Sequence, residues 1–374
     1  PLIIILICWL PYLIAYYPGI LGADQANQVK QFLGYDIPEW SASNSTKLID
    51  ENVKITNHHP VLHTIGIGLC AKLGMAIGNV NFGIFIFTLI QYVMLGIAFA
   101  SIINFMKTLK IPNFLKIISL IIFALSPTIG VCSVQVNKDI IFASLMILFI
   151  IKLYKLLRNA NKEKITLKKC TGIIILGLFV TLFRNNGIYA VILSLPFLAI
   201  IDKLNRKQIL ISSVAILIIY QLIMSVILPA FKIPNSGIRE MLSVPFQQTA
   251  RYVKEHEKDV TTEEKQVIDK VLEYDTLAER YDPLLSDPVK RYFNKDATSE
   301  DLVNYFKVWF GQLIKHPTTY IQATMNNVYG YFYPESNLRQ YNYYMVNSIE
   351  DINEIEGFNY GYIDSLQSMR HFIK

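Results

Sequence analysis

Six long apolar stretches decide what this chain can fold into. A helix that crosses the hydrocarbon core of a bilayer, about 30 Å thick, needs roughly 17 to 25 predominantly apolar residues. Windows of this kind occur near residues 1–17, 82–104, 116–136, 139–157, 171–201 and 209–229. Hydrophobic residues make up 52% of the 374 residues and charged residues only 17%, which is unlike a soluble enzyme. The sequence therefore predicts an all-α, polytopic membrane protein.

The window at 171–201 is interrupted by Arg184, Asn185, Asn186 and Gly187. Polar backbone at membrane depth is tolerated only beside protein or water. We therefore expect two short segments that meet at this polar break. At the other end of the molecule, the chain opens at Pro1 inside the first window, and we expect a cytoplasmic start to precede it.

Basic residues in the linkers predict the orientation of the spans. By the positive-inside rule these linkers lie in the cytoplasm, provided that residues 59–78 do not cross the membrane. We therefore expect 18–80 to form an extracytoplasmic loop, in which 59–78 is a helix on the membrane surface. The net charge of +6 then reflects topology and contact with anionic membrane lipids rather than nucleic acid. The basic residues concerned are Lys107, Lys110, Lys116, those from Lys152 to Lys169, Lys203, Arg206 and Lys207.

With the spans oriented in this way, we expect residues 1–229 to form the membrane module and 230–374 to form a mostly helical extracytoplasmic domain. Thr261 to Glu264 form a capping box, Asp287-Pro288 begins a second helix, and Ser299 to Asp301 begin a third. Tyrosines between 329 and 344 predict either an interfacial aromatic belt or a small core. Gln247, Gln248, Arg251, His316 and Tyr320 also fall in this domain, where we expect them to shape a cleft without having a mechanism for them.

Two polar motifs flank the loop that follows the first apolar window. Asp24 comes shortly after Gly22, and His58-His59-Pro60 with His63 closes the loop. Asp24 is either a helix N-cap or a functional carboxylate at the membrane edge, where partial burial would raise its pKa. Gln25 and Gln28 either face solvent or bind sugar hydroxyls.

This pairing of motifs resembles the first extracytoplasmic loop of the GT-C glycosyltransferases, which have an acidic residue after the first helix and a later His-Pro motif. The chain is more closely similar to a group of uncharacterised multi-span bacterial proteins of the DUF6020 type. The resemblance implies a GT-C-like helical bundle that transfers a sugar from a polyprenyl-phosphate donor. The acceptor would be a glycan, lipid or protein of the cell envelope. Asp24 is followed by Gln25 rather than by a second acid, which departs from the family's pattern.

The histidines invite two readings. His59 and His63 are spaced as i and i+4, as in a two-histidine metal pair. Pro60 stands where a helical metalloprotease has its glutamate, and no third ligand is evident. We expect no metal on these residues, although Mg²⁺ or Mn²⁺ remains open as a cofactor. As the His-Pro motif implies, His58 or His59 lines the substrate pocket, or else has a structural role.

Lys138-Asp139 and Arg184-Asn185 complete the candidate site. On the deduced topology Lys138 and Asp139 face the same space as Asp24. They resemble the second acidic residue and the nearby basic residue that approach the carrier phosphate in the GT-C site. The alternative is that Asp139 caps a helix while Lys138 anchors at the headgroups. Arg184 in an apolar window must find an anion, either the donor phosphate, assisted by Asn185, or a partner such as Asp139.

The sequence thus predicts an extracytoplasmic glycosyltransferase site with Asp24 and Asp139 as catalytic acids. Two rival hypotheses remain. A lipid-linked saccharide flippase or transporter would also bury an arginine, and a non-catalytic envelope-assembly protein would not need Asp24.

Overall fold

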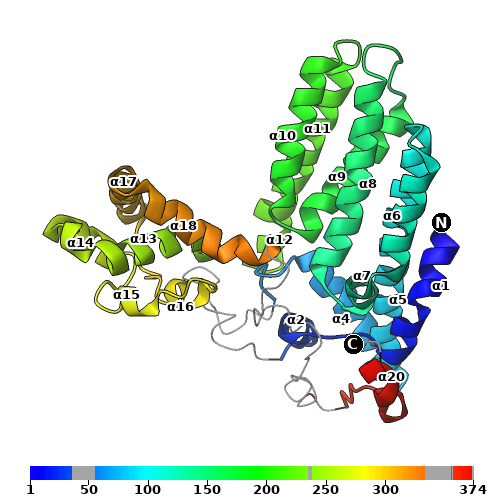
Figure 1. The fold of residues 1–374 in the computed structure, drawn as a ribbon, viewed down its shortest axis with the longest axis horizontal. Helices are drawn as coiled ribbons and strands as arrows, with labels where there is room; N and C mark the ends of the chain where they lie inside the picture. Colours follow the sequence, from blue (N-terminus) through cyan, green and yellow to red (C-terminus); the bar gives the residue numbers. More distant parts are fainter. Residues whose placement is uncertain (36–54, 235–237, 333–354, 356, 373–374) are drawn as a thin grey trace. The chain divides into compact units, whose positions relative to one another are not determined.

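The computed structural model describes residues 1–35, 55–234, 238–332, 355 and 357–372. Contacts divide the chain into two compact units. Unit 1 comprises residues 1–38, 52–234 and 344–374, and unit 2 comprises 39–51 and 235–343. Within the described residues the secondary structure is helical, with two isolated β-bridges and no strand (Figure 1). The all-α expectation is confirmed.

Unit 1 is built around a bundle of apolar helices. Figure 1 shows α8 to α11 running side by side, with α2, α4 and α7 gathered at the end of the bundle where α8 begins. The helices of unit 1 are α1 (Leu2–Ala15), α2 (Ala23–Leu33), α4 (Val61–Ala76), α5 (Val80–Thr108), α6 (Asn113–Leu125), α7 (Pro127–Val134), α8 (Lys138–Arg158), α9 (Leu167–Phe183), α10 (Gly187–Ile201), α11 (Arg206–Leu222), η1 (Ile223–Ile227), α12 (Leu228–Ala230), η6 (Asp364–Leu366) and α20 (Gln367–Phe372).

Three of the described helices are long and apolar enough to cross a membrane: α5, α8 and the continuous segment Arg206–Ala230. A fourth span exists if α6 and α7, which are bent by 53°, are counted together. Helices α1, α4 and α10 are apolar but shorter. These helices support membrane association, but not every apolar window forms a full-length span.

Two of the predicted windows are broken for identifiable reasons. Between α6 and α7, Ser126 takes an extended conformation because the residue before a proline is disfavoured in the helical region. Between α9 and α10, the chain turns at Arg184 and doubles back, as the sequence predicted. A Cβ at Gly187 would lie 2.2 Å from the carbonyl oxygen of Val180, so only glycine fits this turn.

The basic linkers meet at the end of the bundle opposite the start of α8. Arg158 donates from Nη1 to the carbonyl of Thr108 at 2.9 Å, and the backbone N–H of Asn161 donates to Asp202 Oδ1 at 3.0 Å. These contacts bring linkers 109–112, 159–166 and 202–205 together. The 21 residues of α8 separate them from Lys138 by about 30 Å, at 1.5 Å per residue.

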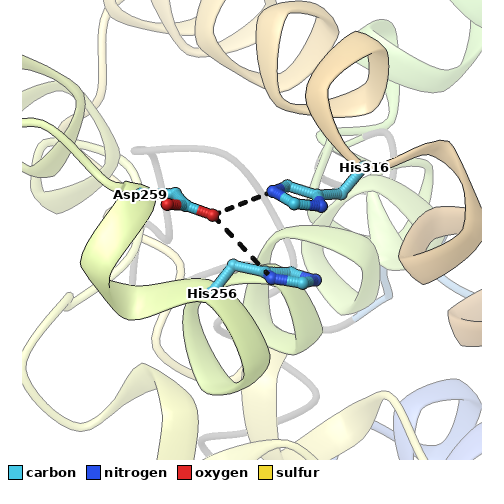
Figure 2. Close-up of side chains that lie close together, drawn as sticks. All are labelled: His256, Asp259 and His316. Atoms are coloured by element: carbon cyan, nitrogen blue, oxygen red, sulfur yellow. Dashed lines mark hydrogen bonds and ion pairs between the residues drawn. The ribbon is translucent and has the colours of Figure 1, made fainter.

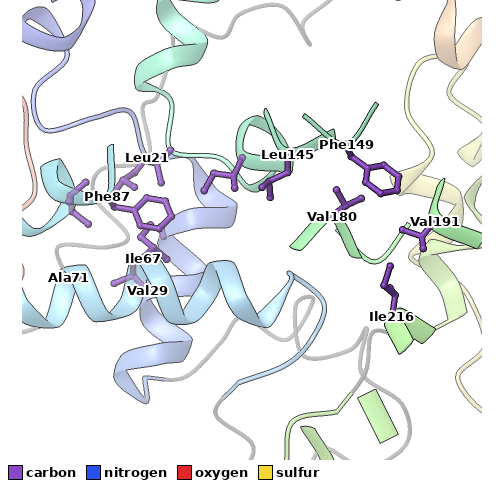
Figure 3. Close-up of a cluster of buried hydrophobic side chains, with 14 of the residues drawn as sticks. Leu21, Val29, Ile67, Ala71, Phe87, Leu145, Phe149, Val180, Val191 and Ile216 are labelled. Atoms are coloured by element: carbon purple, nitrogen blue, oxygen red, sulfur yellow. The ribbon is translucent and has the colours of Figure 1, made fainter. Parts of the chain in front are cut away.

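Buried side chains from α2, α4, α5 and α8 to α11 form one continuous core, part of which is drawn in Figure 3. Helices α4 and α5 approach closely where Gly74 and Gly83 meet. A Cβ at Gly83 would lie 2.2 Å from the carbonyl oxygen of Cys70 and 2.8 Å from Cα of Gly74. This crossing holds α4, which carries His63, against α5, which carries Gln91.

The final segment of the chain belongs to unit 1, which differs from the expected 230–374 domain. Phe358 and Tyr360 are buried in the core that contains Leu21. The Tyr360 hydroxyl donates to the carbonyl of Gly19 at 2.6 Å and accepts from the N–H of Leu21 at 3.2 Å. Such a contact between distant segments has no local signal in the sequence.

Unit 2 is a set of short helices around its own core. Phe246 and Tyr305 are fully buried there. Thr261 and Glu264 form the predicted capping box, and Thr298 with Asp301 forms another. Most of the predicted tyrosine cluster lies outside the described residues. The helices are η2 (Ile238–Glu240), α13 (Ser243–His256), η3 (Glu257–Asp259), α14 (Thr262–Asp269), α15 (Leu277–Arg280), α16 (Asp287–Lys290), α17 (Ser299–Lys315), α18 (Pro317–Val328) and η4 (Tyr329–Tyr331).

Candidate functional site

The start of α8 is fixed by a polar contact in the middle of α5. Gln91 is fully buried, donates from Nε2 to the carbonyl of Gln135 at 2.6 Å, and accepts from the N–H of Asn137 at 3.0 Å. Asn137 in turn caps α8, because its Oδ1 accepts from the N–H of Asp139 at 2.9 Å. Lys138 and Asp139 therefore leave α8 from a defined position.

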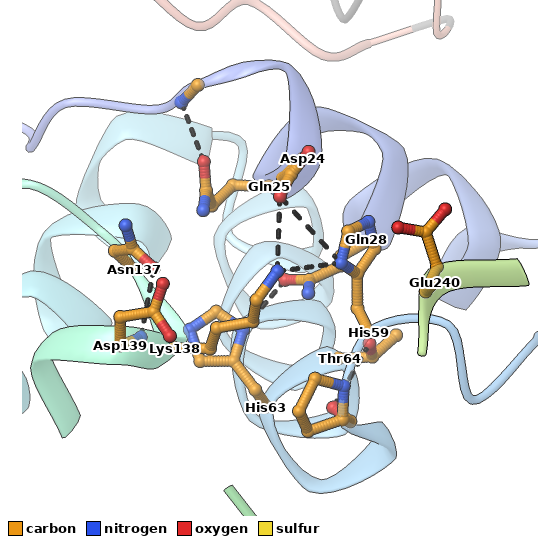
Figure 4. Close-up of polar contacts among 12 residues, drawn as sticks. Asp24, Gln25, Gln28, His59, His63, Thr64, Asn137, Lys138, Asp139 and Glu240 are labelled. Atoms are coloured by element: carbon orange, nitrogen blue, oxygen red, sulfur yellow. Dashed lines mark hydrogen bonds and ion pairs between the residues drawn. The ribbon is translucent and has the colours of Figure 1, made fainter. Parts of the chain in front are cut away.

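Lys138 connects the two polar motifs of the first loop. Its Nζ donates to Oδ2 of Asp24 at 3.1 Å and to Nδ1 of His59 at 2.9 Å (Figure 4). The two partners are themselves close, with 3.8 Å between His59 Nδ1 and Asp24 Oδ2. His59 is 2% exposed and the Lys138 side chain 18%, whereas the Asp24 side chain is 48% exposed. The three residues thus form a charged cluster that is buried at one end and open at the other.

The lysine contact determines the tautomer of His59. An ammonium group can only donate, so Nδ1 must be the acceptor and Nε2 carries the proton of the neutral ring. This Nε2–H is buried and has no hydrogen-bond partner among the described residues. An unmet buried donor is costly, and it is a feature that a bound ligand or water would satisfy.

The electrostatic state of the cluster follows from burial and from Lys138. Burial and the lysine charge lower the pKa of His59 to about 3, and burial also lowers that of His63 to about 3, so both rings are neutral at pH 7. Burial alone would raise the pKa of Asp24, but the charge and hydrogen bond of Lys138 outweigh it and lower that pKa. The raised pKa expected for Asp24 is therefore wrong, because Lys138 stabilises the carboxylate.

Several amide side chains of α2 are buried near this cluster. Gln28 Oε1 is 2.7 Å from Nδ1 of His63, and Gln31 Oε1 accepts from the N–H of Thr56 at 3.2 Å. Five buried polar atoms in this region have no partner among the described residues: Gln28 Nε2, Gln31 Nε2, Thr56 Oγ1, His59 Nε2 and His63 Nε2. A polar interior with several unmet groups is suited to hydroxyl-rich ligands and bound water.

Asp139 and Arg184 form a second ion pair next to the cluster. The carboxylate Oδ1 of Asp139 contacts Nη1 of Arg184, and both side chains are partly exposed. The Arg184 guanidinium also lies over the ring of Phe142, 5.7 Å from its centroid. Asn185 has a buried Oδ1 without a partner in the described part of the chain. The structure thus contains the structural partner of Arg184 that the sequence left as an alternative.

Several sequence interpretations need correction. Asp24 is not the N-cap of its helix, since Gly22 holds that position and Gln25 Oε1 accepts from its N–H at 3.0 Å. Gln25 and Gln28 are buried and do not face solvent. Asp139 is not a cap either, because Asn137 takes that role.

The two histidines also differ from the expected pair on one helical face. Helix α4 begins only at Val61, so His59 precedes it while His63 lies within it. Their ring nitrogens have different partners, Lys138 and Gln28. His58 packs edge-to-face against His59, with 4.5 Å between ring centroids. A cation at Asp24 and His59 would have to displace the Lys138 ammonium, whose charge opposes metal binding there.

Gln91, Gln31 and Asn57 support the site but were not singled out from the sequence. Asn57 fixes the approach to His59, because its N–H donates to the carbonyl of Pro234 at 2.8 Å. Gln91 carried a usable signal, since a lone amide inside an apolar window must find buried partners. Gln31 and Asn57 show no comparable signal, because neighbouring polar residues surround them.

Comparison with known families supports the membership that the motifs indicated. A family of unknown function, DUF6020, matches residues 1–369. No curated protein and no solved structure matches the chain. The match extends over the candidate site and over both units, so the chain belongs to the DUF6020 family.

Proposed function

We propose that this protein is a membrane glycosyltransferase of GT-C-like architecture that transfers a sugar from a polyprenyl-phosphate donor to a cell-envelope acceptor. The observation that carries the proposal is the contact of Lys138 with both Asp24 and His59. This contact brings together the Asp24 carboxylate, the Lys138 ammonium group and a His59 ring whose Nε2–H has no partner among the described residues. The apolar helices of the same unit are long enough to hold a lipid donor. Glycosyl transfer needs a group that activates the acceptor and a cation for the leaving phosphate.

In this mechanism the acceptor hydroxyl oxygen attacks the anomeric carbon of the sugar. The bond between that carbon and the phosphate oxygen breaks, and its electron pair remains on the polyprenyl phosphate. The hydroxyl proton moves to the Asp24 carboxylate, and Lys138 neutralises the departing phosphate. The Nε2–H of His59 donates to a phosphate or sugar oxygen, and the buried amides of Gln25 and Gln28 line the sugar side.

Donor binding and base strength are coupled in this arrangement. A phosphate placed against Lys138 competes with Asp24 for the ammonium group. As the phosphate takes over this contact, Asp24 loses the cation that lowers its pKa and becomes a stronger base. The acid is thereby held ionised and paired until the donor is in place.

Arg184 is assigned to the same phosphate, with Asn185 assisting. Guanidinium has five N–H donors, and the contact with Asp139 involves Nη1. Arg184 can therefore pair with Asp139 and with a phosphate together. Asp139 acts here as the acid that orients Arg184.

The proposed site faces away from the cytoplasm. The three basic linkers meet at the opposite end of the bundle, which the positive-inside rule places in the cytoplasm. In a variant with the native cysteines replaced by serine, a cysteine at Ser286 should react with an impermeant reagent on intact cells, and one at Asn161 should not. Ser43, the other loop position of interest, lies outside the described residues. Cytoplasmic labelling at Ser286 would place unit 2 on the wrong side for this mechanism.

The function itself is tested by transfer from labelled polyprenyl-phosphate hexoses and pentoses in proteoliposomes. Asp24→Asn keeps the shape of the side chain but removes the base, so turnover should fall by about 10²-fold or more while donor binding persists. Lys138→Ala should instead weaken donor binding by about 1.5 to 3 kcal/mol. Glu163→Gln, at the far end of the bundle, is the matched control and should transfer normally.

Full transfer by Asp24→Asn would refute the catalytic assignment. Movement of lipid-linked saccharide between leaflets without transfer would establish the flippase hypothesis. A third outcome would favour a non-catalytic role. In that case, cells carrying Asp24→Asn would keep both sugar transfer and saccharide movement, and envelope assembly would fail only when the whole chain is deleted.

A further inference from the structure

Unit 2 contains a cluster of three side chains from two parts of its fold. His256 is the last residue of α13, Asp259 is the last residue of η3, and His316 lies between α17 and α18. Figure 2 shows the two imidazole rings face to face, with the Asp259 carboxylate at one edge of both. The ring centroids are 3.7 Å apart and the planes differ by 11°.

The nitrogens and the carboxylate oxygen lie at metal-ligand spacing. Asp259 Oδ2 is 2.9 Å from Nε2 of His316 and 3.9 Å from Nδ1 of His256. The three ligand atoms all lie within 4.8 Å of one another. Ligands bound tetrahedrally to Zn²⁺ at about 2.0 to 2.1 Å are about 3.3 Å apart, which these distances bracket.

A hydrogen-bond chain on the other side of His256 fixes its tautomer. Thr319 Oγ1 donates to Glu255 Oε2 at 3.4 Å, because a carboxylate can only accept. The same hydroxyl is 2.9 Å from Nε2 of His256, so its oxygen accepts the proton of that nitrogen. In the neutral ring Nδ1 is then left with a lone pair that faces the Asp259 carboxylate. Outer partners of this kind commonly orient histidine ligands in metal sites.

We propose that His256, Asp259 and His316 bind a divalent metal ion of the Zn²⁺ class. The cation would lie between the His256 lone pair and the carboxylate, which otherwise repel, and would displace the proton that His316 donates to Asp259. Two imidazoles and one carboxylate suit Zn²⁺ rather than Mg²⁺ or Ca²⁺, which prefer oxygen ligands. One ring must tilt out of the stack so that the two nitrogen lone pairs converge.

The bound ion would join the end of α13 to the α17–α18 junction. These helices contribute large buried side chains to unit 2, including Phe246, Tyr252, Tyr305 and Tyr320. All three ligands are partly exposed, with side chains between 26% and 51% accessible, so the ion can enter from solvent and keep a water as its fourth ligand. Its role is to clamp unit 2, and it is independent of the proposed transferase chemistry in unit 1.

The test uses full-length protein in detergent, stripped with a chelator, desalted and titrated with Zn²⁺, with Co²⁺ absorption as a probe of ligand geometry. One tightly held ion per chain is expected, together with a higher unfolding temperature. Asp259→Asn and His316→Gln should each abolish both effects, and His371→Ala, an exposed histidine of unit 1, should leave them intact. Thr319→Val keeps all three ligands and should weaken binding by about 10- to 100-fold through the lost orientation of His256.

Helical content measured by circular dichroism separates loss of a ligand from loss of the fold. If the folded wild-type protein binds no Zn²⁺, or if folded Asp259→Asn and His316→Gln bind it as tightly as the wild type, the assignment is overturned. It is also overturned if binding disappears instead in His63→Gln, which would move the ion to unit 1.

Discussion

The ammonium group of Lys138 lies 2.9 Å from Nδ1 of His59, closer than its 3.1 Å distance to Asp24 Oδ2. The neutral histidine is therefore a full partner of the lysine and not a bystander to a salt bridge. His59 is buried, whereas Asp24 is half exposed and can be solvated by water. Loss of the lysine should therefore cost more free energy through the unpaired His59 nitrogen than through the unpaired Asp24 carboxylate.

Lys138→Met should destabilise the protein by about 1 to 3 kcal/mol, the cost of leaving a buried polar group without a partner. Asp24→Asn should cost less than about 1 kcal/mol, because that carboxylate is half exposed and its ion pair is screened by water. Denaturant unfolding in mixed micelles measures both, and the double variant gives their coupling. As a control, Lys265→Met removes the exposed contact with Asp275 and should leave unfolding unchanged. Equal costs for Lys138→Met and Asp24→Asn would argue against His59 as the main partner.

Acid should weaken unit 1 well above the range in which carboxylates titrate. The pKa values of His59 and His63 are lowered to about 3, against about 6.5 in an unfolded chain. Below pH 6.5 the unfolded state binds protons that the folded state rejects, so stability falls as pH falls. Between pH 7 and 5 each histidine should contribute a loss of about 2 kcal/mol. The lowered pKa of Asp24 acts only at lower pH, because its stabilisation is lost as pH falls below about 4.

His63→Gln should remove about half of this pH dependence, and His371→Gln should leave it intact. Unfolding measured at several pH values in one detergent provides the comparison. A pH profile that does not change in His63→Gln would show that this ring is protonated in the folded protein.

The crossing of α4 and α5 predicts a contrast between two glycines. Gly83→Ala places a Cβ against backbone atoms of Cys70 and Gly74 that cannot move aside, and overpacking of this kind costs about 1 to 3 kcal/mol. Gly311→Ala in α17 meets nothing within 4 Å and should stabilise the protein by up to about 1 kcal/mol through helix propensity. Melting temperatures of the two variants should therefore shift in opposite directions.

The Asp139–Arg184 pair separates a structural role from a functional one. Asp139→Arg and Arg184→Asp should each lower stability, by no more than about 1 kcal/mol because both side chains are substantially exposed. The double swap should restore stability, since opposite charges face each other again. Donor binding should not return, because the group at position 184 is then an anion that repels phosphate. Recovery of donor binding in the swap would show that Arg184 only holds Asp139.

Features that depend on neighbouring residues could be predicted from the sequence. The capping box at Thr261 rests on neighbouring side chains whose hydrogen bonds are local. The break at Arg184 is visible as a short run of polar residues inside an apolar window. The sequence singled out Asp24, His59 and Lys138 from their motifs, and the structure brings these three residues into contact.

Features that depend on long-range packing could not be predicted. A helix with Gln25, Asn27, Gln28 and Gln31 reads as solvent-exposed, because no local rule says that its polar face turns inward. The cluster of His256 with His316 likewise joins residues 60 positions apart, through a fold that the sequence pattern does not specify. The residue that lowers the pKa of Asp24 could not be identified from the sequence either, because Lys138 is 114 positions away.

The hydroxyl of Tyr360 bonds to both Gly19 and Leu21, just ahead of the helix that carries Asp24. Translation proceeds from the N-terminus, so Asp24 emerges from the ribosome hundreds of residues before the tyrosine that fastens its segment. Until then the Gly19 carbonyl and the Leu21 amide lack this partner. The geometry of Asp24 is therefore completed only after the bundle helices and unit 2 have been made, which delays assembly of the site until residue 360 has been translated.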